Sequence, residues 1–303
     1  MIRERRPLAA CALACGVLLG SCAALGAASK AETVFLGEED PELAGAALPT
    51  FIKASEMLLA ADPKDRDKAV ATASLYVMYA NAFVDGPASY LPDDRFEERK
   101  AAADRAGALY RRAFRLLAGA LERRSPGILE AAKAGRAEAL ARLGRGDVPL
   151  LYWSAASVLA AFGLNPLDFE SAANVGAAGL FLARAAELDP GWNGGALYEL
   201  YLPYYASLPP YMGGDPAKAL DAYRKALEYS GGQSASLFVA YATSICVPAD
   251  DYAGYRAALE RALAIDPQSR PDARLATVLA QRRARWLLDG ADRYFAIPEE
   301  GGK

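Results

Sequence analysis

Apolar residues recur every three or four positions along most of the chain, and clusters of proline or glycine interrupt this pattern about every twenty residues. Alanine and leucine, which favour helices, dominate, and strand-like alternation of β-branched residues is nearly absent. The pattern therefore predicts an all-α fold. The expected helices span residues 48–61, 68–84, 96–122, 127–142, 150–162, 168–188, 194–208, 216–229, 234–246, 252–265 and 271–290.

Several residues fit the ends of these helices. Pro149 and Pro216 suit the first turn of a helix, and Asp147 and Asp215 stand close enough before them to act as N-caps. Glycine suits the turn after a helix, because it adopts left-handed backbone angles at no steric cost. Glycines at such positions are Gly163, Gly191 and Gly231.

Three predicted helices share one spacing of residues. The second helix of a tetratricopeptide hairpin carries a small residue, a large apolar residue four later, alanine three after that and proline five beyond. The first helices of the hairpins lack the expected signature, so the repeats are degenerate, and an accidental run of alanine-rich helices is the weaker alternative. We predict an α-solenoid of tetratricopeptide-like hairpins whose concave face binds extended segments or partner surfaces. Matching positions are Ala178, Leu182, Ala185 and Pro190, then Ala219, Tyr223 and Ala226, then Tyr255, Leu259, Ala262 and Pro267.

The start of the chain resembles a bacterial lipoprotein signal. Three arginines within the first six residues precede an apolar stretch, residues 8–19, that is too short to span a membrane stably. The run LGSC at positions 19–22 is similar to a lipobox, in which cleavage precedes an acylated cysteine. We therefore expect a signal peptide over 1–21, a tether over 22–45 that is anchored through lipid on Cys22, and a helical-repeat domain over 46–298.

Two alternatives to this cleavage site exist. An ordinary secretory signal could be cut near Ala28, where small residues also have cleavage spacing. A rival lipobox ends at Cys15, but its first position carries alanine where a larger aliphatic residue is favoured. Cys22 remains the preferred lipidation site. Ala23, which follows it, lacks the aspartate that often retains lipoproteins at the inner membrane, and this slightly favours the outer membrane.

Composition narrows the function. Without residues 1–21 the chain has 31 basic and 36 acidic residues, which argues against nucleic acid as a partner. Histidine is absent, so Ser-His-Asp and Cys-His catalysis and histidine-ligated zinc are excluded. The chain has no phosphate-binding loop, serine-hydrolase elbow or dinucleotide fingerprint. We therefore predict a protein that is not an enzyme and that has no cofactor and no metal site.

The body of the chain must be held together by packing. Of the four cysteines, only Cys246 lies beyond the signal and the anchor, so no intramolecular disulfide is expected. After Leu19 no uninterrupted apolar run approaches the length of a membrane-spanning helix. We therefore expect a globular body tethered to the membrane, not one that spans it.

The densest aromatic region covers residues 198–216. It combines a tyrosine-rich helix that contains Pro203, which should kink it, with a stiff loop of prolines and glycines. Most of these tyrosines suit a core face, but a ring with a hydroxyl at one end also suits a ligand or partner surface. The residues that we predict to bind a ligand or partner are Tyr198, Tyr201, Tyr204, Tyr205, Tyr211, Met212, Trp153 and Trp192.

Two charged residues interrupt apolar stripes. Glu199 lies in an otherwise apolar helix, and Arg282 falls on the stripe of the last helix that includes Trp286. Because apolar stripes rarely admit unpaired charge, we predict an ion pair between Glu199 and a partly buried Arg282. The alternative is a solvated basic run, Arg282, Arg283 and Arg285, that surrounds Trp286.

Five segments together resemble the TatT family, the tetratricopeptide-like lipoprotein components of tripartite ATP-independent periplasmic (TRAP) transporters. They are LYVMYANAFVDGPA at 75–88, LLYWSAAS at 150–157, LARAAELDPGWNGGALYE at 182–199, SLPPYMGGDPAKAL at 207–220 and LATVLAQRRARWLL at 275–288. The resemblance implies an all-helical homotrimer with a hole or cleft through each protomer. It also implies a partner, the periplasmic solute-binding protein (P component), whose ligand can be apolar.

These observations support three hypotheses. The first is a non-enzymatic, lipid-anchored periplasmic subunit of a TRAP-type uptake system that docks a solute-binding protein and passes on its ligand. The second is a helical-repeat lipoprotein that scaffolds envelope or outer-membrane assembly. The third is an enzyme that uses two carboxylates, and it requires both to line one cleft within about 10 Å of each other.

Overall fold

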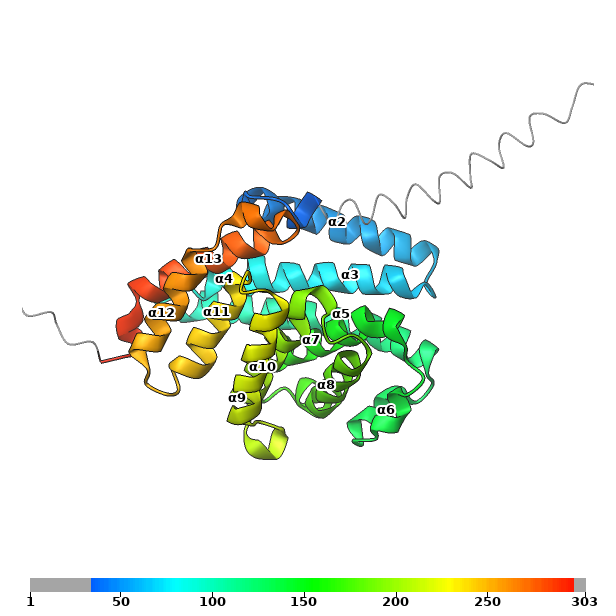
Figure 1. Cartoon of the computed structure of the whole chain (residues 1–303). Coiled ribbons are helices and arrows are strands. Elements are labelled where there is room, and N and C mark those ends of the chain that lie inside the picture. Colours follow the sequence, from blue (N-terminus) through cyan, green and yellow to red (C-terminus); the bar gives the residue numbers. More distant parts are fainter. Residues whose placement is uncertain (1–33, 297–303) are drawn as a thin grey trace, which may run out of the picture.

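The computed structural model describes residues 34–296. This part of the chain is helical throughout and contains no strand, so the all-α prediction is confirmed (Figure 1). The α-helices are α2 (Pro41–Ala61), α3 (Arg66–Tyr79), α4 (Gly86–Ala88), α5 (Phe96–Arg124), α6 (Ile128–Lys133), α7 (Val148–Leu164), α8 (Phe169–Leu188), α9 (Ala196–Ser207), α10 (Pro216–Tyr229), α11 (Ala235–Tyr241), α12 (Tyr252–Leu263) and α13 (Arg274–Asp289). The short helical segments that the site uses are η1 (Ala80–Asp85), η4 (Trp192–Gly195), η5 (Pro210–Met212), η6 (Ala242–Cys246) and η8 (Pro271–Ala273).

Most helix ends lie near their predicted positions, and capping explains two of the differences. α2 begins at Pro41 and not at residue 48, because Asp40 accepts hydrogen bonds from the amides of Glu42 and Leu43. The predicted helix over 127–142 is wrong. The observed helix α6 ends at Lys133, Gly135 two residues later has a φ of +75°, and the chain then forms a short 3₁₀ turn over Ala137–Leu140.

The other predicted caps had mixed outcomes. Asp215 caps α10 through the amides of Ala217 and Lys218, as expected. Gly231, with a φ of +59°, ends the same helix. The prediction for Asp147 is wrong, because its carboxylate binds the preceding turn and two arginines in place of the amides of α7. Gly163 is also misplaced, since it lies inside α7.

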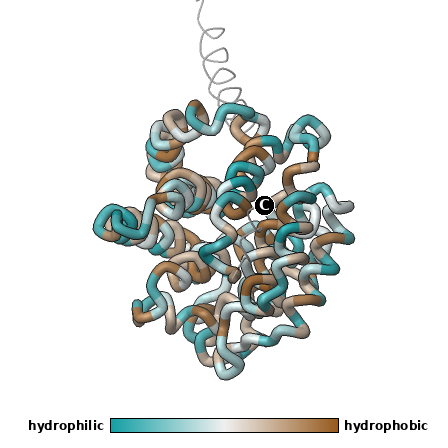
Figure 2. The backbone as a smooth tube through the Cα atoms, turned by 90° about the vertical axis from the view of Figure 1, so that its left-hand side faces the viewer, coloured by the Kyte–Doolittle hydropathy of each residue, from teal (hydrophilic) through white to brown (hydrophobic). Residues whose placement is uncertain are grey.

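Neighbouring helices pair as hairpins. α7 packs on α8, α9 on α10, and α11 on α12. Figure 2 shows hydrophobic and hydrophilic segments alternating along the tube, as expected for amphipathic helices. The repeat positions of the second helices are fully buried where they pack, for example Ala185, Ala226 and Ala262. The arrangement is consistent with a solenoid of degenerate repeats, which stays a prediction.

The buried side chains form two clusters. The larger runs from Ile52 on α2 to Leu237 on α11, and the smaller covers the C-terminal helices from α11 to Phe295. Tyr223, Leu227 and Tyr241 pack against both clusters and so join them. Cys246 belongs to the smaller cluster as a free, buried thiol, and burial raises its pKa to about 11.

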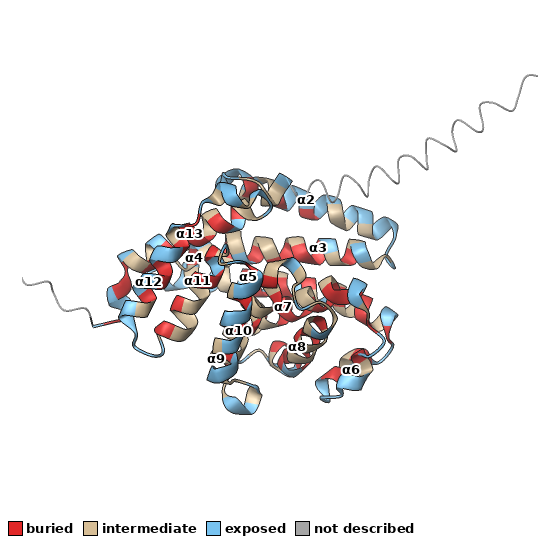
Figure 3. Cartoon of the chain, in the orientation of Figure 1, coloured by how far each residue is buried: buried red, intermediate tan, exposed pale blue. Residues whose placement is uncertain are grey.

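α2 and the stretch from Arg145 to Leu164 are long and apolar enough to cross a membrane by length and composition alone. The second stretch is largely buried among other helices, as expected for the core helix of a globular protein. α2 is instead mostly exposed (Figure 3), and Leu43, Met57 and Leu58 lie on its exposed side.

Candidate apolar cavity and tyrosine surface

An apolar cavity of about 510 Å³ lies between the N-terminal helices and the C-terminal helices. α2, α3 and η1 form one wall, and α11 and α13 form the other, so segments far apart in the sequence enclose it. A second cavity of about 320 Å³, which we call the side cavity, shares four lining residues with it: Ala82, Phe83, Tyr90 and Leu279. The apolar side chains that line the larger cavity include Leu48, Leu75, Met78, Phe83, Val239 and Leu275.

A π-helical segment shapes this cavity. α3 changes at Ala80 into η1, which contributes Asn81, Phe83 and Asp85 to the lining. Pro87 lies just beyond and has no amide hydrogen, so a regular α-helix could not continue with all its bonds. The amide of Gly86 instead donates to the Asn81 carbonyl five residues back, and a Cβ on Gly86 would crowd that oxygen. The widened turn therefore directs Asn81 and Phe83 towards the cavity.

The cavity has one charged end. The Arg283 guanidinium donates to the Ser89 hydroxyl at 2.6 Å and lies over the rings of Tyr90 and Trp286. Asp85 lies in the opposite wall, on η1; burial raises its pKa, and the charge of Arg283 opposes this rise. A mainly apolar cavity with a few convergent polar groups is typical of a small-molecule site.

The tyrosines of α9 form a stacked array. The Tyr201 and Tyr205 rings are parallel, with centroids 5.1 Å apart, and Tyr204 meets Tyr205 edge-on at 5.0 Å. Tyr198 stacks on Tyr229 of α10 at 5.5 Å. Tyr201 is buried, which fits the core role expected for most of these rings, whereas Tyr198, Tyr204 and Tyr205 are half-buried.

The loop after α9 extends this array. Tyr211 on η5 is 88% exposed, and Met212 beside it is half-buried. The loop turns tightly at Gly214, where a Cβ would overlap the Leu208 carbonyl. Gly213 has a φ of +103° and leaves room for the Tyr204 hydroxyl. We call the exposed and half-buried residues of α9 and of this loop that the sequence analysis selected the tyrosine surface: Tyr198, Tyr204, Tyr205, Tyr211 and Met212.

The two predicted tryptophans lie in a different group. Tyr152 of α7 contacts both of them, with ring centroids 5.0 Å from Trp153 and 4.8 Å from Trp192. The structure thus brings Trp153 and Trp192 together through a residue that the sequence analysis did not select, although Tyr152 precedes Trp153 directly. Burial raises the pKa of Tyr152.

The predicted ion pair between Glu199 and Arg282 is wrong. Arg282 is exposed and donates to Glu42 of α2 at 2.7 Å, because this side of α13 faces the start of α2. The hydrogen bond from Arg282 lowers the pKa of Glu42. Glu199 instead accepts hydrogen bonds from Ser234 and Ser236. The alternative of a basic run around Trp286 is closer to the structure, since Arg282 and Arg285 are exposed and Arg283 lies over the Trp286 ring.

Paired carboxylates are not found in the cavities described here. The apolar cavity includes Asp85 and the side cavity Glu42, while a third, polar cavity includes Glu199, one carboxylate in each case. The described residues also contain no group of three or more metal-ligating side chains. These cavities thus lack the pair that the carboxylate-enzyme hypothesis requires.

The described helices and cavities thus define an all-α protein with an apolar cavity between its N-terminal and C-terminal helices. The chain belongs to the TAtT family, the TRAP transporter T-component, whose sequence pattern matches residues 37–295. It is also 38% identical over 266 residues to a protein of Treponema pallidum (strain Nichols) that is described only as uncharacterized. That match covers 86% of this chain and 82% of the relative. Family membership associates the chain with a TRAP transporter system and indicates a periplasmic, membrane-associated protein.

Proposed function

We propose that this chain is a non-enzymatic, lipid-anchored subunit that docks a periplasmic substrate-binding protein, the P component, and passes on its apolar ligand. The anchor is Cys22, which lies outside the described residues, as does the signal peptide over 1–21. The tether over 22–45 reaches into the start of α2. Three copies of the chain form a homotrimer, and the lipid anchor of each copy lies in the outer membrane.

The tyrosine surface is the observation that carries the docking proposal. Tyrosine provides a large, rigid contact area with a polar tip, and it is enriched at the energetic centres of protein interfaces. Tyr211 projects at the tip of the α9–α10 loop. Lys218 and Lys225 lie over the rings of Tyr205 and Tyr198, and each also pairs with an aspartate, Asp215 and Asp221 respectively, so the rim is polar and carries both charges. Such a surface fits a partner with a polar rim around an apolar patch.

The apolar cavity supports ligand transfer. Its volume of about 510 Å³ falls within the range of small-molecule pockets. Its lining is mainly aliphatic and aromatic, and its polar side chains are Asn81, Asp85, Ser89, Ser236 and Arg283. A ligand released by the docked partner would bury its apolar surface against these side chains and away from water, and this burial favours the binding of apolar ligands.

Replacing Tyr211 with alanine is expected to weaken docking about tenfold or more, because aromatic residues at interface centres contribute most of the binding free energy. The measurement is affinity capture of the binding protein from a periplasmic extract, followed by titration calorimetry with the captured partner. Tyr252→Ala is the matched control, since Tyr252 is a partly exposed tyrosine on α12, outside the tyrosine surface. Equal affinity of the two variants would remove this surface from the proposal.

Native mass spectrometry of the captured complex tests the assembly. We expect three copies of this chain with bound substrate-binding protein. Recovery of outer-membrane assembly factors in place of a binding protein would support the scaffold hypothesis and contradict ours.

Replacing Ala82 with phenylalanine is expected to reduce binding of a neutral apolar dye, N-phenylnaphthylamine, about tenfold. Ala82 lines both the apolar cavity and the side cavity, so a larger side chain fills space that the dye needs. Dye fluorescence is the measurement, and Ala54→Phe on the exposed side of α2 is the control. Undiminished dye binding in Ala82→Phe would show that the dye binds elsewhere.

A further inference from the structure

A third cavity, of about 160 Å³, differs from the apolar cavity in its chemistry. Four parts of the fold form it: α7, the η4–α9 junction, the loop before α11, and the η8–α13 junction. It shares only Ser236 and Ala276 with the apolar cavity. Most of the side chains that line this polar cavity can form hydrogen bonds, among them Tyr152, Glu199, Gln233, Ser236, Arg270 and Thr277.

Glu199 provides the negative charge of the polar cavity. Its carboxylate accepts hydrogen bonds from the hydroxyls of Ser234 and Ser236, and it forms no ion pair among the described residues. Burial raises the pKa of this carboxyl, and the Ser234 and Ser236 hydroxyls and the charge of Arg270 only partly oppose the rise. Among the described residues no cation contacts this carboxyl, so a ligand ammonium in the cavity could pair with it, and that pairing would favour its ionised form.

Arg270 provides the positive charge. Its Nη2 atom donates to Asp272 at 3.0 Å, and the guanidinium lies over Gly194, where a Cβ would touch Nη1. Asn193, Gly194 and Gly195 all have positive φ values, of 47°, 63° and 90°. Asparagine is among the few residues with a Cβ that often adopt this left-handed conformation, and glycine adopts it at no steric cost. This conformation brings the η4 backbone against the guanidinium.

Glu199 and Arg270 thus line one cavity as an acidic and a basic group that do not contact each other, and Arg270 also pairs with Asp272. A ligand that carries an ammonium and a carboxylate could pair with both, and each new bond would be a charge-assisted hydrogen bond. The volume corresponds to about five waters at about 30 Å³ each, which limits the ligand to a few heavy atoms beyond the two charged groups.

We propose that the polar cavity binds a small zwitterion of the α-amino-acid type, with its ammonium at Glu199 and its carboxylate at Arg270. This site is separate from the apolar cavity and goes beyond the proposed function, because it needs neither the docking partner nor an apolar ligand. Tyr152 places an aromatic ring in the wall, which suits a short aliphatic side chain.

The test is titration calorimetry of the purified protein with L-alanine and L-proline. Propylamine and propionate, which each carry only one of the two charges, are the comparison probes. We expect both amino acids to bind at least about tenfold more tightly than propylamine or propionate, because each of these two probes lacks one of the charge-assisted bonds. Equal binding of propylamine or propionate, or no binding of the amino acids at millimolar concentration, would overturn the proposal.

Two variants locate the site. Glu199→Gln keeps the shape and one acceptor oxygen for the serines but removes the charge, and Arg270→Gln removes the opposite charge. Each is expected to weaken L-alanine binding about tenfold or more. Glu187→Gln, an exposed acid on α8 that pairs with Arg184, is the control and should leave binding unchanged. Thermal melting checks the fold.

If Glu199→Gln does not fold, Arg270→Gln still decides the proposal, because Arg270 lies in the loop before α13, outside the two buried clusters. Unchanged binding in a folded variant of either residue would contradict the site. The docking experiment with Tyr211 is independent of these results.

Discussion

Replacing Asp147 with alanine is expected to lower the free energy of unfolding by about 3 kcal/mol. Breaking a buried ion pair by removing one partner typically costs 3–5 kcal/mol, and the low end applies here because both arginine partners are partly exposed. Chemical denaturation of the wild type and of Asp147→Ala at neutral pH measures the difference.

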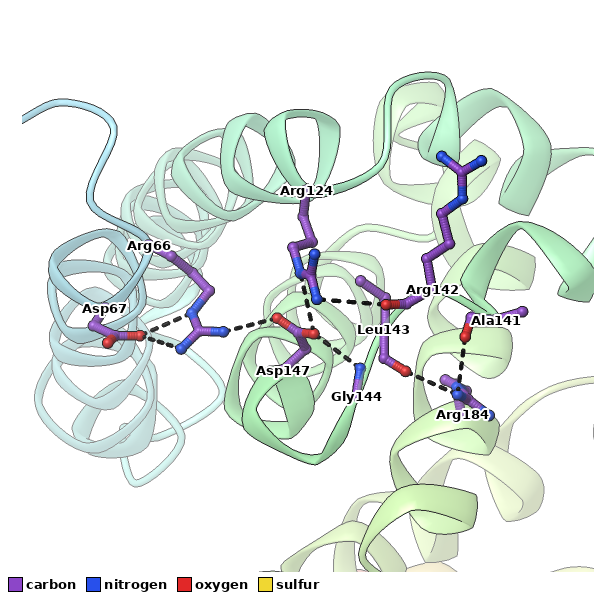
Figure 4. A network of polar contacts seen from close by, with 9 residues as sticks. All are labelled: Arg66, Asp67, Arg124, Ala141, Arg142, Leu143, Gly144, Asp147 and Arg184. Carbon is purple, nitrogen blue, oxygen red and sulfur yellow. Dashed lines mark hydrogen bonds and ion pairs between the residues drawn. The ribbon is translucent and has the colours of Figure 1, made fainter.

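The expected loss follows from the position of Asp147 between three segments (Figure 4). Its side chain is only 3% exposed and accepts from Arg66 of α3 at 2.9 Å, from Arg124 of α5 at 3.3 Å and from the Gly144 amide at 2.9 Å. The carboxylate therefore joins the start of α7 to α3 and α5. Its removal leaves two guanidinium groups near each other without their shared anion.

The same site predicts a pH dependence. Burial alone would raise the pKa of Asp147, but the Gly144 amide and the two arginines outweigh it, so the folded pKa lies below the ordinary value of 3.8. The ionised form thus stabilises the fold fully above that value, and this contribution is lost as the pH falls through the folded pKa. We expect the gap between wild type and variant to narrow only in acid below about pH 4.

Asp67→Ala is the control for this prediction. Asp67 binds the same Arg66 guanidinium, but its side chain is 73% exposed. Exposed ion pairs contribute about 0–1 kcal/mol, so Asp67→Ala should change stability little. A comparable loss in both variants would assign the effect to Arg66 and not to burial of Asp147.

Replacing Phe181 with alanine is expected to destabilise the protein by about 4 kcal/mol. Phe181 lies on α8, is 0% exposed and belongs to the larger buried cluster. Truncation of a buried phenylalanine typically costs about 3–5 kcal/mol, because it removes apolar contacts and leaves a cavity that the surroundings fill only in part. Denaturant unfolding is again the measurement.

α8 also supplies the control. Phe169 is the first residue of the same helix and is 90% exposed. Phe169→Ala removes the same atoms without creating a cavity, so its effect should stay within about 0.5 kcal/mol. A loss in Phe169→Ala close to that of Phe181→Ala would mean that the phenylalanine at 169 is covered in the protein as it exists, for example by another copy of the chain.

The helices could be predicted because their signals are local. Asp215 and Pro216 begin a helix wherever the chain presents them, and a glycine with a positive φ ends one, as Gly231 does. The candidate site was predictable only in part. The tyrosines of α9 gather on one helix through their own spacing, whereas Tyr152 was missed because no spacing shows that its ring joins Trp153 and Trp192.

The ion-pair partners of charged residues could not be predicted from the sequence. A charge within an apolar helix stripe indicates that it faces another helix, but the spacing does not show which helix that is. Arg282 and Glu199 both lie on packed helices. Because α13 packs against the start of α2, Arg282 forms its ion pair with Glu42. Glu199 instead accepts hydrogen bonds from Ser234 and Ser236, which lie at the start of α11. Asp147 was expected to cap its own helix, but arginines of two other helices reach it first.

By itself, the sequence determined the all-α class, most of the helix ranges and the family resemblance, because periodicity, capping and segment motifs depend on residues close together in the chain. The tertiary structure alone decided the cavities and the ion pairs. The apolar cavity lies between helices whose lining residues are about 150 to 235 positions apart, and its walls meet only when the intervening hairpins have stacked. The polar cavity depends in the same way on how η4 and the start of α13 come together.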